Sequence, residues 1–103
     1  MGKGQFWLHR PIRIMRATDS GKSLARELAA HGILVNAIAP GLIDTPMGNA
    51  TGEYGVKGYL ERCPLGRMGQ PEDIANLAVF LGSAASNYIT GQAWNVCGGY
   101  LMA

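Results

Sequence analysis

The segment that most constrains the fold is the run 33–39, Ile-Leu-Val-Asn-Ala-Ile-Ala, which ends abruptly at Pro40-Gly41. It is apolar at successive positions, a pattern typical of parallel strands that helices cover on both faces. Parallel α/β sheets bind ligands at the carboxyl ends of their strands. The sequence therefore predicts a buried strand that delivers a glycine-containing loop, 40–45, to a ligand-binding edge.

Two helix patterns flank this strand along the chain. Strong helix formers fill 22–30, and Gly32 supplies the left-handed residue expected just past a helix end. A second helix is predicted from Pro71, with acids in its first turn, to about 82–85. Its apolar stripe, at helical spacing, consists of Ile74, Leu77, Ala78 and Leu81. A final short strand is predicted at 93–96, so we expect an α/β fold.

Residues 1–18 differ in character from the rest of the chain, because four Lys or Arg residues precede the first acid, Asp19. The alternating apolar residues on either side of Arg13 allow a short edge strand. An Arg-rich, acid-free start also resembles a transit peptide or a basic arm for nucleic acid. We interpret 1–18 as an irregular, atypical basic leader and 19–103 as the folded segment.

The composition is that of a globular protein, with 48% hydrophobic and 16% charged residues. A formal net charge of +2 is too small to indicate nucleic acid binding. No apolar run reaches the roughly 18 residues of a membrane span, and no secretory signal core is visible, so we expect a cytoplasmic protein. Cys63 and Cys97 are then expected to be free thiols. Neither His9 nor His31 has ligands at metal-binding spacing, so no metal site is expected.

Residues 46–70 are rich in glycine and show no clear period. Long connections at the carboxyl end of a strand are usually lids or binding loops. The spacing of Gly48, Gly52 and Gly55 superficially suggests a phosphate-binding loop, but it follows no predicted strand and opens no obvious helix. We therefore expect a lid or a surface loop here.

In the order of their predicted helices, strands and loops, residues 22–99 resemble the C-terminal portion of the short-chain dehydrogenase/reductase family. These are Rossmann-fold enzymes that pass hydride between NAD(H) or NADP(H) and an alcohol or carbonyl. The resemblance is carried by Lys22-Ser-Leu-Ala-Arg-Glu-Leu-Ala, Val35-Asn-Ala-Ile-Ala-Pro-Gly41, Pro40-Gly-Leu-Ile-Asp-Thr45, Pro64-Leu-Gly-Arg-Met-Gly-Gln-Pro-Glu-Asp-Ile74, Ile89-Thr-Gly-Gln92 and Gly98-Gly99. It implies a partial Rossmann-type fold: the C-terminal portion of a doubly wound parallel sheet, with two main helices and about two strands.

The resemblance also implies a cofactor-binding role for the loop after the strand. Pro40 and Gly41 would bring the backbone close to the nicotinamide ring of NAD or NADP. The main chain near Ile43 would bond the carboxamide, and the Thr45 hydroxyl would contact the amide or the pyrophosphate. The alternative is a turn that simply ends the strand, with Thr45 as a helix cap.

The following segment, 47–65, would be the mobile substrate lid of the family. Met47, Tyr54 and Tyr59 would then line the site of a small alcohol or carbonyl substrate. The alternative is an ordinary surface loop with a few packed side chains. Asn36 matches a structural position of the family pattern and is given no chemical role.

The residues that perform the family's chemistry are not found in this sequence. The family needs a Tyr as general acid/base, a Lys four residues later and a Ser upstream, and an ungapped count places Arg10 and Ile14 at the first two positions. No Tyr precedes Tyr54, and Gly2-Lys-Gly4 is too short for the dinucleotide fingerprint. We expect no catalytic residues, and a truncated family member that is inactive alone.

A second interpretation is a non-enzymatic association module that pairs with itself or with a full-length relative. In the family, the second helix and the last strand pack against a neighbouring subunit. Leu24, Leu28 and the apolar stripe within 74–81 would then face a partner, or else form an ordinary core within the chain. A weaker third interpretation is a basic-arm nucleic acid binder, which salt-sensitive binding would support.

Overall fold

The computed structural model describes residues 12–16 and 22–102, and these form a three-stranded parallel sheet with helices on both faces. The strands are β1 (Ile12–Arg16), β2 (Ile33–Pro40) and β3 (Ala93–Val96), in the spatial order β1-β2-β3. The first half of β2 pairs with β1 and its second half with β3. The strand with the longest apolar run is therefore the centre of the sheet.

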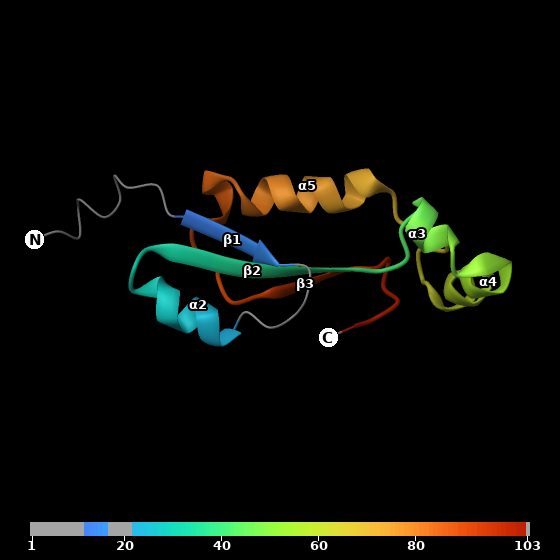
Figure 1. Cartoon of the computed structure of the whole chain (residues 1–103), viewed down its shortest axis with the longest axis horizontal. Coiled ribbons are helices and arrows are strands. Elements are labelled where there is room, and N and C mark those ends of the chain that lie inside the picture. The colour runs from blue at the N-terminus through green and yellow to red at the C-terminus, as the bar shows by residue number, and fades with distance from the viewer. Residues whose placement is uncertain (1–11, 17–21, 103) are drawn as a thin grey trace, which may run out of the picture.

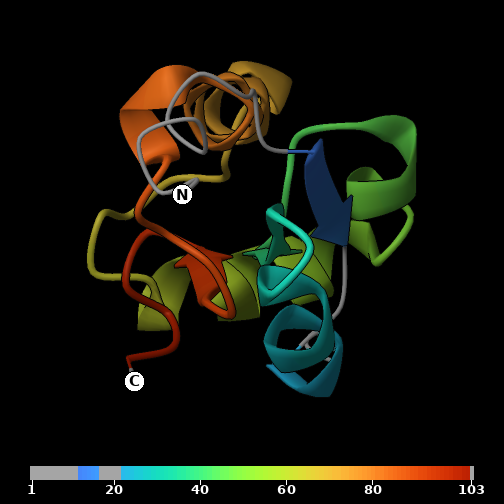
Figure 2. The same cartoon turned by 90° about the vertical axis from the view of Figure 1, so that its left-hand side faces the viewer.

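Helices α2 and α5 lie on opposite faces of this sheet (Figures 1 and 2). Helix α2 (Lys22–Ala29) and helix α5 (Pro71–Leu81) lie close to the positions that their sequence patterns predict. Coverage on both faces explains the apolar character of β2, in which Val35 to Ile38 are all buried. The α/β fold with a parallel sheet is confirmed.

The turn between α2 and β2 needs a glycine. Gly32 has φ +71°, a left-handed conformation that side chains with a Cβ rarely adopt. The Gly32 N–H donates to Ala29 and the His31 N–H donates to Leu28, so the last carbonyls of α2 find partners. This closure lets the chain reverse directly into the central strand.

Helix α5 is fixed at both ends by side chains. At its start, Asp73 accepts a hydrogen bond from the Gln70 N–H at 2.7 Å. Beyond its end, the chain forms a short 3-10 helix, η1 (Ala84–Ser86), whose buried Ser86 hydroxyl donates to the Leu81 carbonyl at 2.8 Å. Leu81 itself is 1% exposed and anchors the helix in the core.

The N-terminal part of the chain departs from the expected irregular leader. Residues 12–16 are strand β1, in parallel register with β2 from the pair Ile12–Ile33 to the pair Arg16–Ala37. The edge strand that the alternation allowed is thus present, and it adds a third strand to the two expected. Arg10, and the residues 17–21 that precede α2, lie outside the described residues.

Two helices occupy the segment that the sequence predicts as a loop. Helix α3 (Pro46–Asn49) and helix α4 (Gly52–Arg62) lie beyond the carboxyl end of β2 (Figure 1). Neither helix buries a residue completely, so neither shows the apolar period by which helices are recognised in a sequence. Most of the segment expected as a lid or a surface loop is therefore helical, and a role as a lid remains a prediction.

Candidate functional site

The loop predicted to bind a ligand lies where the carboxyl ends of β2 and β3 meet. The Gly41 N–H donates to the Val96 carbonyl at 2.8 Å, so the ladder between the two strands continues into the loop. Farther along, the loop pairs with the segment that precedes α5, through an isolated parallel bridge between Ile43 and Gly69. The loop 40–45 is held on two sides by backbone hydrogen bonds, and its conformation is fixed by the fold.

Ile43 keeps one backbone donor available in this arrangement. In the bridge between Ile43 and Gly69, the hydrogen bonds are made by the residues on either side of Ile43. The Gly69 N–H donates to the Leu42 carbonyl at 2.9 Å, and the Asp44 N–H donates to the Gly69 carbonyl at 2.8 Å. The Ile43 carbonyl accepts from the Thr45 N–H at 2.8 Å. The Ile43 N–H donates to no residue within 12–16 or 22–102, so it is a backbone donor at the ligand-binding edge of the sheet.

Thr45 serves as the N-cap of α3. Its hydroxyl oxygen accepts from the Gly48 N–H at 3.1 Å, and its backbone is extended, as at other helix caps. Gly48 has no room for a side chain, because a Cβ would collide with the Ile43 carbonyl. The capping role that spacing allowed is present, and contact with a cofactor remains a prediction.

Gly41 is required by two neighbours from elsewhere in the chain. A Cβ at this position would collide with the Tyr59 hydroxyl and would lie 2.8 Å from both Cα and Cβ of Cys97. The close backbone approach expected at Gly41 therefore exists, but the groups that approach are Tyr59 and Cys97. Pro40, the last residue of β2, pairs with Val96 at the same level.

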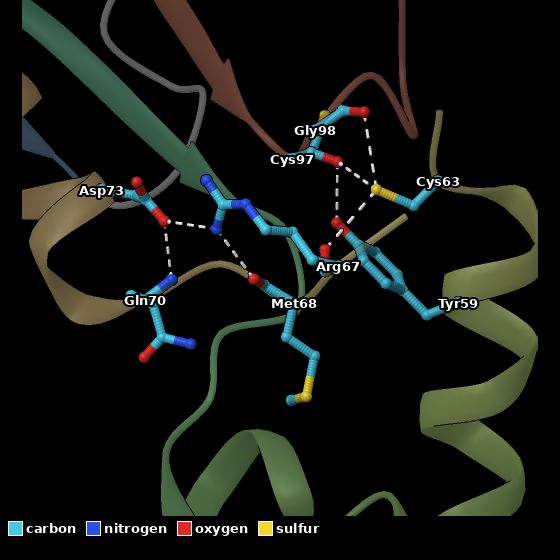
Figure 3. A network of polar contacts seen from close by, with 8 residues as sticks. All are labelled: Tyr59, Cys63, Arg67, Met68, Gln70, Asp73, Cys97 and Gly98. Carbon is cyan, nitrogen blue, oxygen red and sulfur yellow. Dashed lines mark hydrogen bonds and ion pairs between the residues drawn. The ribbon is translucent and has the colours of Figure 1, made fainter. Parts of the chain in front are cut away.

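The three predicted lid residues have different surroundings. Tyr59 of α4 points to the end of β3 and donates its hydroxyl hydrogen to the Cys97 carbonyl at 2.8 Å (Figure 3). Met47 and Tyr54 are 85% and 92% exposed. Burial raises the pKa of Tyr59, although a backbone hydrogen bond from Leu42 acts in the opposite direction. The structure thus brings Tyr59, and neither Met47 nor Tyr54, to the loop 40–45.

The thiol of Cys63 is surrounded by backbone groups at the end of α4. Its Sγ lies 3.6 Å from the Cys97 carbonyl oxygen and 3.5 Å from that of Gly98 (Figure 3). Burial by itself raises the pKa of this thiol, but backbone hydrogen bonds from Gly66, Arg67 and Leu65 lower it overall. Cys63 and Cys97 are both free and buried, which confirms the expectation of free thiols.

An ion pair next to this site was not found from the sequence. Arg67 contacts Asp73 at 3.0 Å and also donates to the Met68 carbonyl (Figure 3). The hydrogen bond from Arg67, together with that from the Gln70 N–H, lowers the pKa of Asp73. Asp73 lies three residues after Gln70, the N-cap of α5, and an acid at this spacing predicts a hydrogen bond with the backbone N–H of the cap residue. No signal in the sequence pairs it with Arg67.

A pocket of about 200 Å³ opens beside these groups. Its lining comes from the segment before α5, the start of that helix and the end of β3: Leu65, Arg67, Gly69, Asp73, Val96, Cys97 and Gly98. Gly69 also belongs to the bridge that holds Ile43, so the pocket adjoins the loop 40–45. The arrangement offers a backbone donor, an ion pair and an apolar wall, which suits a polar, planar group.

Asn36 lies in the middle of β2, where its side chain makes structural contacts. Its side-chain amide donates to the Ile89 carbonyl at 3.1 Å, and its side-chain oxygen accepts from the Gln92 N–H at 3.2 Å. These bonds join β2 to the segment that leads into β3. Among the residues that the structure describes, no helix has the length and apolar character needed to cross a membrane.

Comparison with families of known proteins gives one match that covers most of the chain. The family model described as enoyl-(acyl carrier protein) reductase matches residues 17–101. Among curated proteins, the chain is 50% identical over 78 residues to 3-oxoacyl-[acyl-carrier-protein] reductase FabG of Aquifex aeolicus. It is 47% identical over 78 residues to the (2S)-[(R)-hydroxy(phenyl)methyl]succinyl-CoA dehydrogenase subunit BbsD of Thauera aromatica. Each alignment covers 76% of this chain and 32% of the relative.

A solved structure supports the same relationship. A crystal structure from Agrobacterium tumefaciens with bound NADP has a TM-score of 0.73 and 53% sequence identity to this chain. The match covers 77% of this chain and 33% of that protein. The chain therefore spans about one third of the length of the relatives it matches.

Proposed function

Because this chain belongs to the short-chain dehydrogenase/reductase family, we propose that its loop 40–45 forms the nicotinamide side of a binding site for NAD(H) or NADP(H). The observation that carries the proposal is the Ile43 N–H, which has no partner among the described residues at the carboxyl end of the central strand. A carboxamide oxygen is a suitable acceptor for such a donor.

The residues of the loop fit one end of the cofactor. The Ile43 N–H would donate to the carboxamide oxygen. The second lone pair of the Thr45 hydroxyl would accept from the carboxamide NH2, or the hydroxyl would donate its hydrogen to the pyrophosphate. Pro40 and Gly41 would hold the loop backbone in place against β3. When bound, the cofactor supplies or accepts the hydride, while these residues orient the ring and exclude water from one side of it.

Turnover by these 103 residues alone is not part of the proposal. The family's chemistry requires a Tyr and a Lys four residues later, and this sequence holds no Tyr before Tyr54. A phenol with an ordinary pKa near 10 needs such a neighbour to act as an acid or base near neutral pH. The chain would bind or position a cofactor, and other residues would have to perform the proton transfer.

The class of substrate is a small alcohol or carbonyl compound, with Met47, Tyr54 and Tyr59 proposed as lid residues. The two curated relatives have nearly the same identity to this chain, although their names give different substrates. The similarity of this segment therefore leaves the individual substrate open. The expected cytoplasmic location is likewise a prediction, which fractionation of cells with an antibody would test.

A titration of the purified chain with NADH and with NADPH tests the proposal through the nicotinamide fluorescence. We expect saturable binding that Thr45→Val weakens by roughly 2- to 10-fold, the usual effect of one lost hydrogen bond. Thr45→Ser keeps the hydroxyl and is the matched control, with nearly unchanged affinity. Absence of saturable binding at millimolar cofactor would contradict the proposal. Measurable oxidation of NADH by the chain alone with a carbonyl substrate would instead contradict the expectation that the chain is inactive on its own.

A second candidate function is association with a second copy or with a full-length relative. It is favoured by apolar side chains exposed on and after α5: Val79 is 72% exposed, and Tyr88 is fully exposed. Sedimentation of the purified chain distinguishes the two. A defined dimer without cofactor affinity would favour association, and a monomer that binds NADH would favour the cofactor site.

A further inference from the structure

Helix α4 is attached to the rest of the molecule by few side chains. It packs on α3, none of its residues is fully buried, and it has no extensive contact with any strand in the described part of the chain. Its one aromatic side chain that contacts the sheet edge is Tyr59, because Tyr54 is 92% exposed. The position of α4 therefore depends on Tyr59 and, at the end of the helix, on the buried Cys63, whose Sγ contacts the Cys97 and Gly98 carbonyls.

The C-terminal tail holds the Tyr59 ring. The rings of Tyr59 and Tyr100 are stacked, with centroids 4.7 Å apart and planes 16° from parallel. The tail itself is folded back on Cys97: the Tyr100 N–H donates to the Cys97 carbonyl at 3.1 Å, and the Leu101 N–H donates to the Cys97 Sγ at 3.4 Å. The stacked ring of Tyr100 is thus presented by a turn with its own hydrogen bonds.

The carbonyl oxygen of Cys97 links helix α4 to the C-terminal tail. The Cys97 carbonyl accepts from the Tyr59 hydroxyl at 2.8 Å as well as from the Tyr100 N–H. Cys97 directly follows β3, and the Tyr59 hydroxyl fills the space that a Cβ at Gly41 would take. Tyr59 therefore connects its own helix, α4, to the C-terminal tail and to the loop after β2.

We propose that Tyr59 and Tyr100 form a latch that holds α4 against the carboxyl ends of β2 and β3. When the stack is broken, α4 swings away from the loop 40–45 while the sheet stays folded. Both tyrosines are positioning residues in this account, and Tyr100 acts through Tyr59. The latch is a property of these contacts and stands whether or not the loop 40–45 binds a cofactor.

Hydrogen–deuterium exchange of the purified chain, read by peptide mass, tests the latch without any cofactor. In Tyr100→Ala we expect exchange in 52–62 to rise by roughly 2- to 10-fold, the range expected from one lost aromatic pair. Exchange in 33–40 should stay unchanged. Tyr100→Phe keeps the stacked ring and should keep the slow exchange of the parent chain, whereas the unchanged exchange of 33–40 in Tyr100→Ala separates the latch from a general loss of packing.

Two further variants complete the design. Tyr59→Phe keeps the stack but loses the hydrogen bond to Cys97, and it should raise exchange in 52–62 by less than Tyr100→Ala does. Tyr88→Ala removes an aromatic ring that is fully exposed and should change nothing in 52–62. Unchanged exchange of 52–62 in Tyr100→Ala would overturn the latch. A parallel rise in 33–40 would also overturn it, because α4 would then open only together with the sheet.

Discussion

At the scale of single residues, several glycines allow close approaches around the site, and Gly41, Gly48 and Gly98 are three of them. Gly41 leaves space for Tyr59, Gly48 for the Ile43 carbonyl, and Gly98 for Cys63, whose Sγ would lie 2.7 Å from an added Cβ. Only Gly98 of these three also has a left-handed backbone, with φ +60°. In a sequence, such glycines look the same as glycines of a flexible loop, because the groups that approach them come from distant segments.

Replacement of Gly98 tests this crowding. Gly98→Ala should destabilise the fold by more than Gly66→Ala, because both positions have φ near +60 to +70° but only Gly98 has a neighbour within contact distance. The left-handed backbone alone costs an alanine about 1–2 kcal/mol. Urea unfolding of both variants gives the comparison. Equal losses would show that Cys63 moves aside at no cost.

The Arg67–Asp73 ion pair predicts a dependence of stability on pH. The pKa of Asp73 in the folded state lies below its ordinary value of 3.8, so the pair stabilises the fold above that value. The contribution is lost as the pH falls through the folded-state pKa. Asp73→Asn keeps an oxygen for the Gln70 N–H and loses the charge.

We therefore expect Asp73→Asn to lower the melting temperature near neutral pH, with the difference from the parent chain vanishing in acid, below the folded-state pKa of Asp73. The control is Glu72→Gln, which removes a neighbouring acid that has no ion pair among the described residues. Melting curves across this pH range give the answer. A difference that persists in acid would mean that Asp73 acts through packing rather than through its charge.

At the scale of helices and strands, the sequence predicts most of the elements that build and cover the sheet but not helices α3 and α4. Helix α5 and strand β2 have local signals: an apolar period, a proline and acids at the helix start, and an unbroken apolar run. The four residues of β3 were also predicted at their observed positions, Ala93–Val96. These patterns are read within about a dozen residues, so no tertiary contact is needed to recognise them.

Helices α3 and α4 lack such signals for a physical reason. They bury no residue fully, and glycines at 52, 55 and 58 lower the helix propensity of α4. In the candidate site too, local patterns could be predicted from the sequence and long-range contacts could not. Pro40, Gly41, Ile43 and Thr45 lie at the predicted edge, but the contact of Tyr59 with Cys97 joins residues 38 positions apart and has no signature in the sequence.

The core face of α5 gives a test at this scale. Leu81→Ala should destabilise the fold by about 2–5 kcal/mol, because Leu81 is fully buried and the substitution leaves a cavity. Val79→Ala, on the same helix but 72% exposed, should stay within about 0.5 kcal/mol of the parent. Urea unfolding measures both. Similar losses at the two positions would mean that the exposed side of α5 is covered by a partner, which favours association.

At the scale of the whole molecule, the central strand of the sheet has all its neighbours within the described residues. Strand β2 has a partner on each edge and a helix on each face, and its loop is held on two sides. The chain spans only about one third of its relatives. The central claim is therefore limited: the carboxyl end of β2 presents a preformed backbone donor to a nicotinamide.

The most direct measurement is an amide chemical-shift titration of the ¹⁵N-labelled chain with NADH. The account predicts that the amide signals of Ile43 and Thr45 shift progressively and saturate. The amide of Gly66, a left-handed turn residue at which an added Cβ would meet no atom within 4 Å, should not move. Signals of 40–45 that stay fixed while any others shift would contradict the account, because the cofactor would then bind elsewhere or not at all.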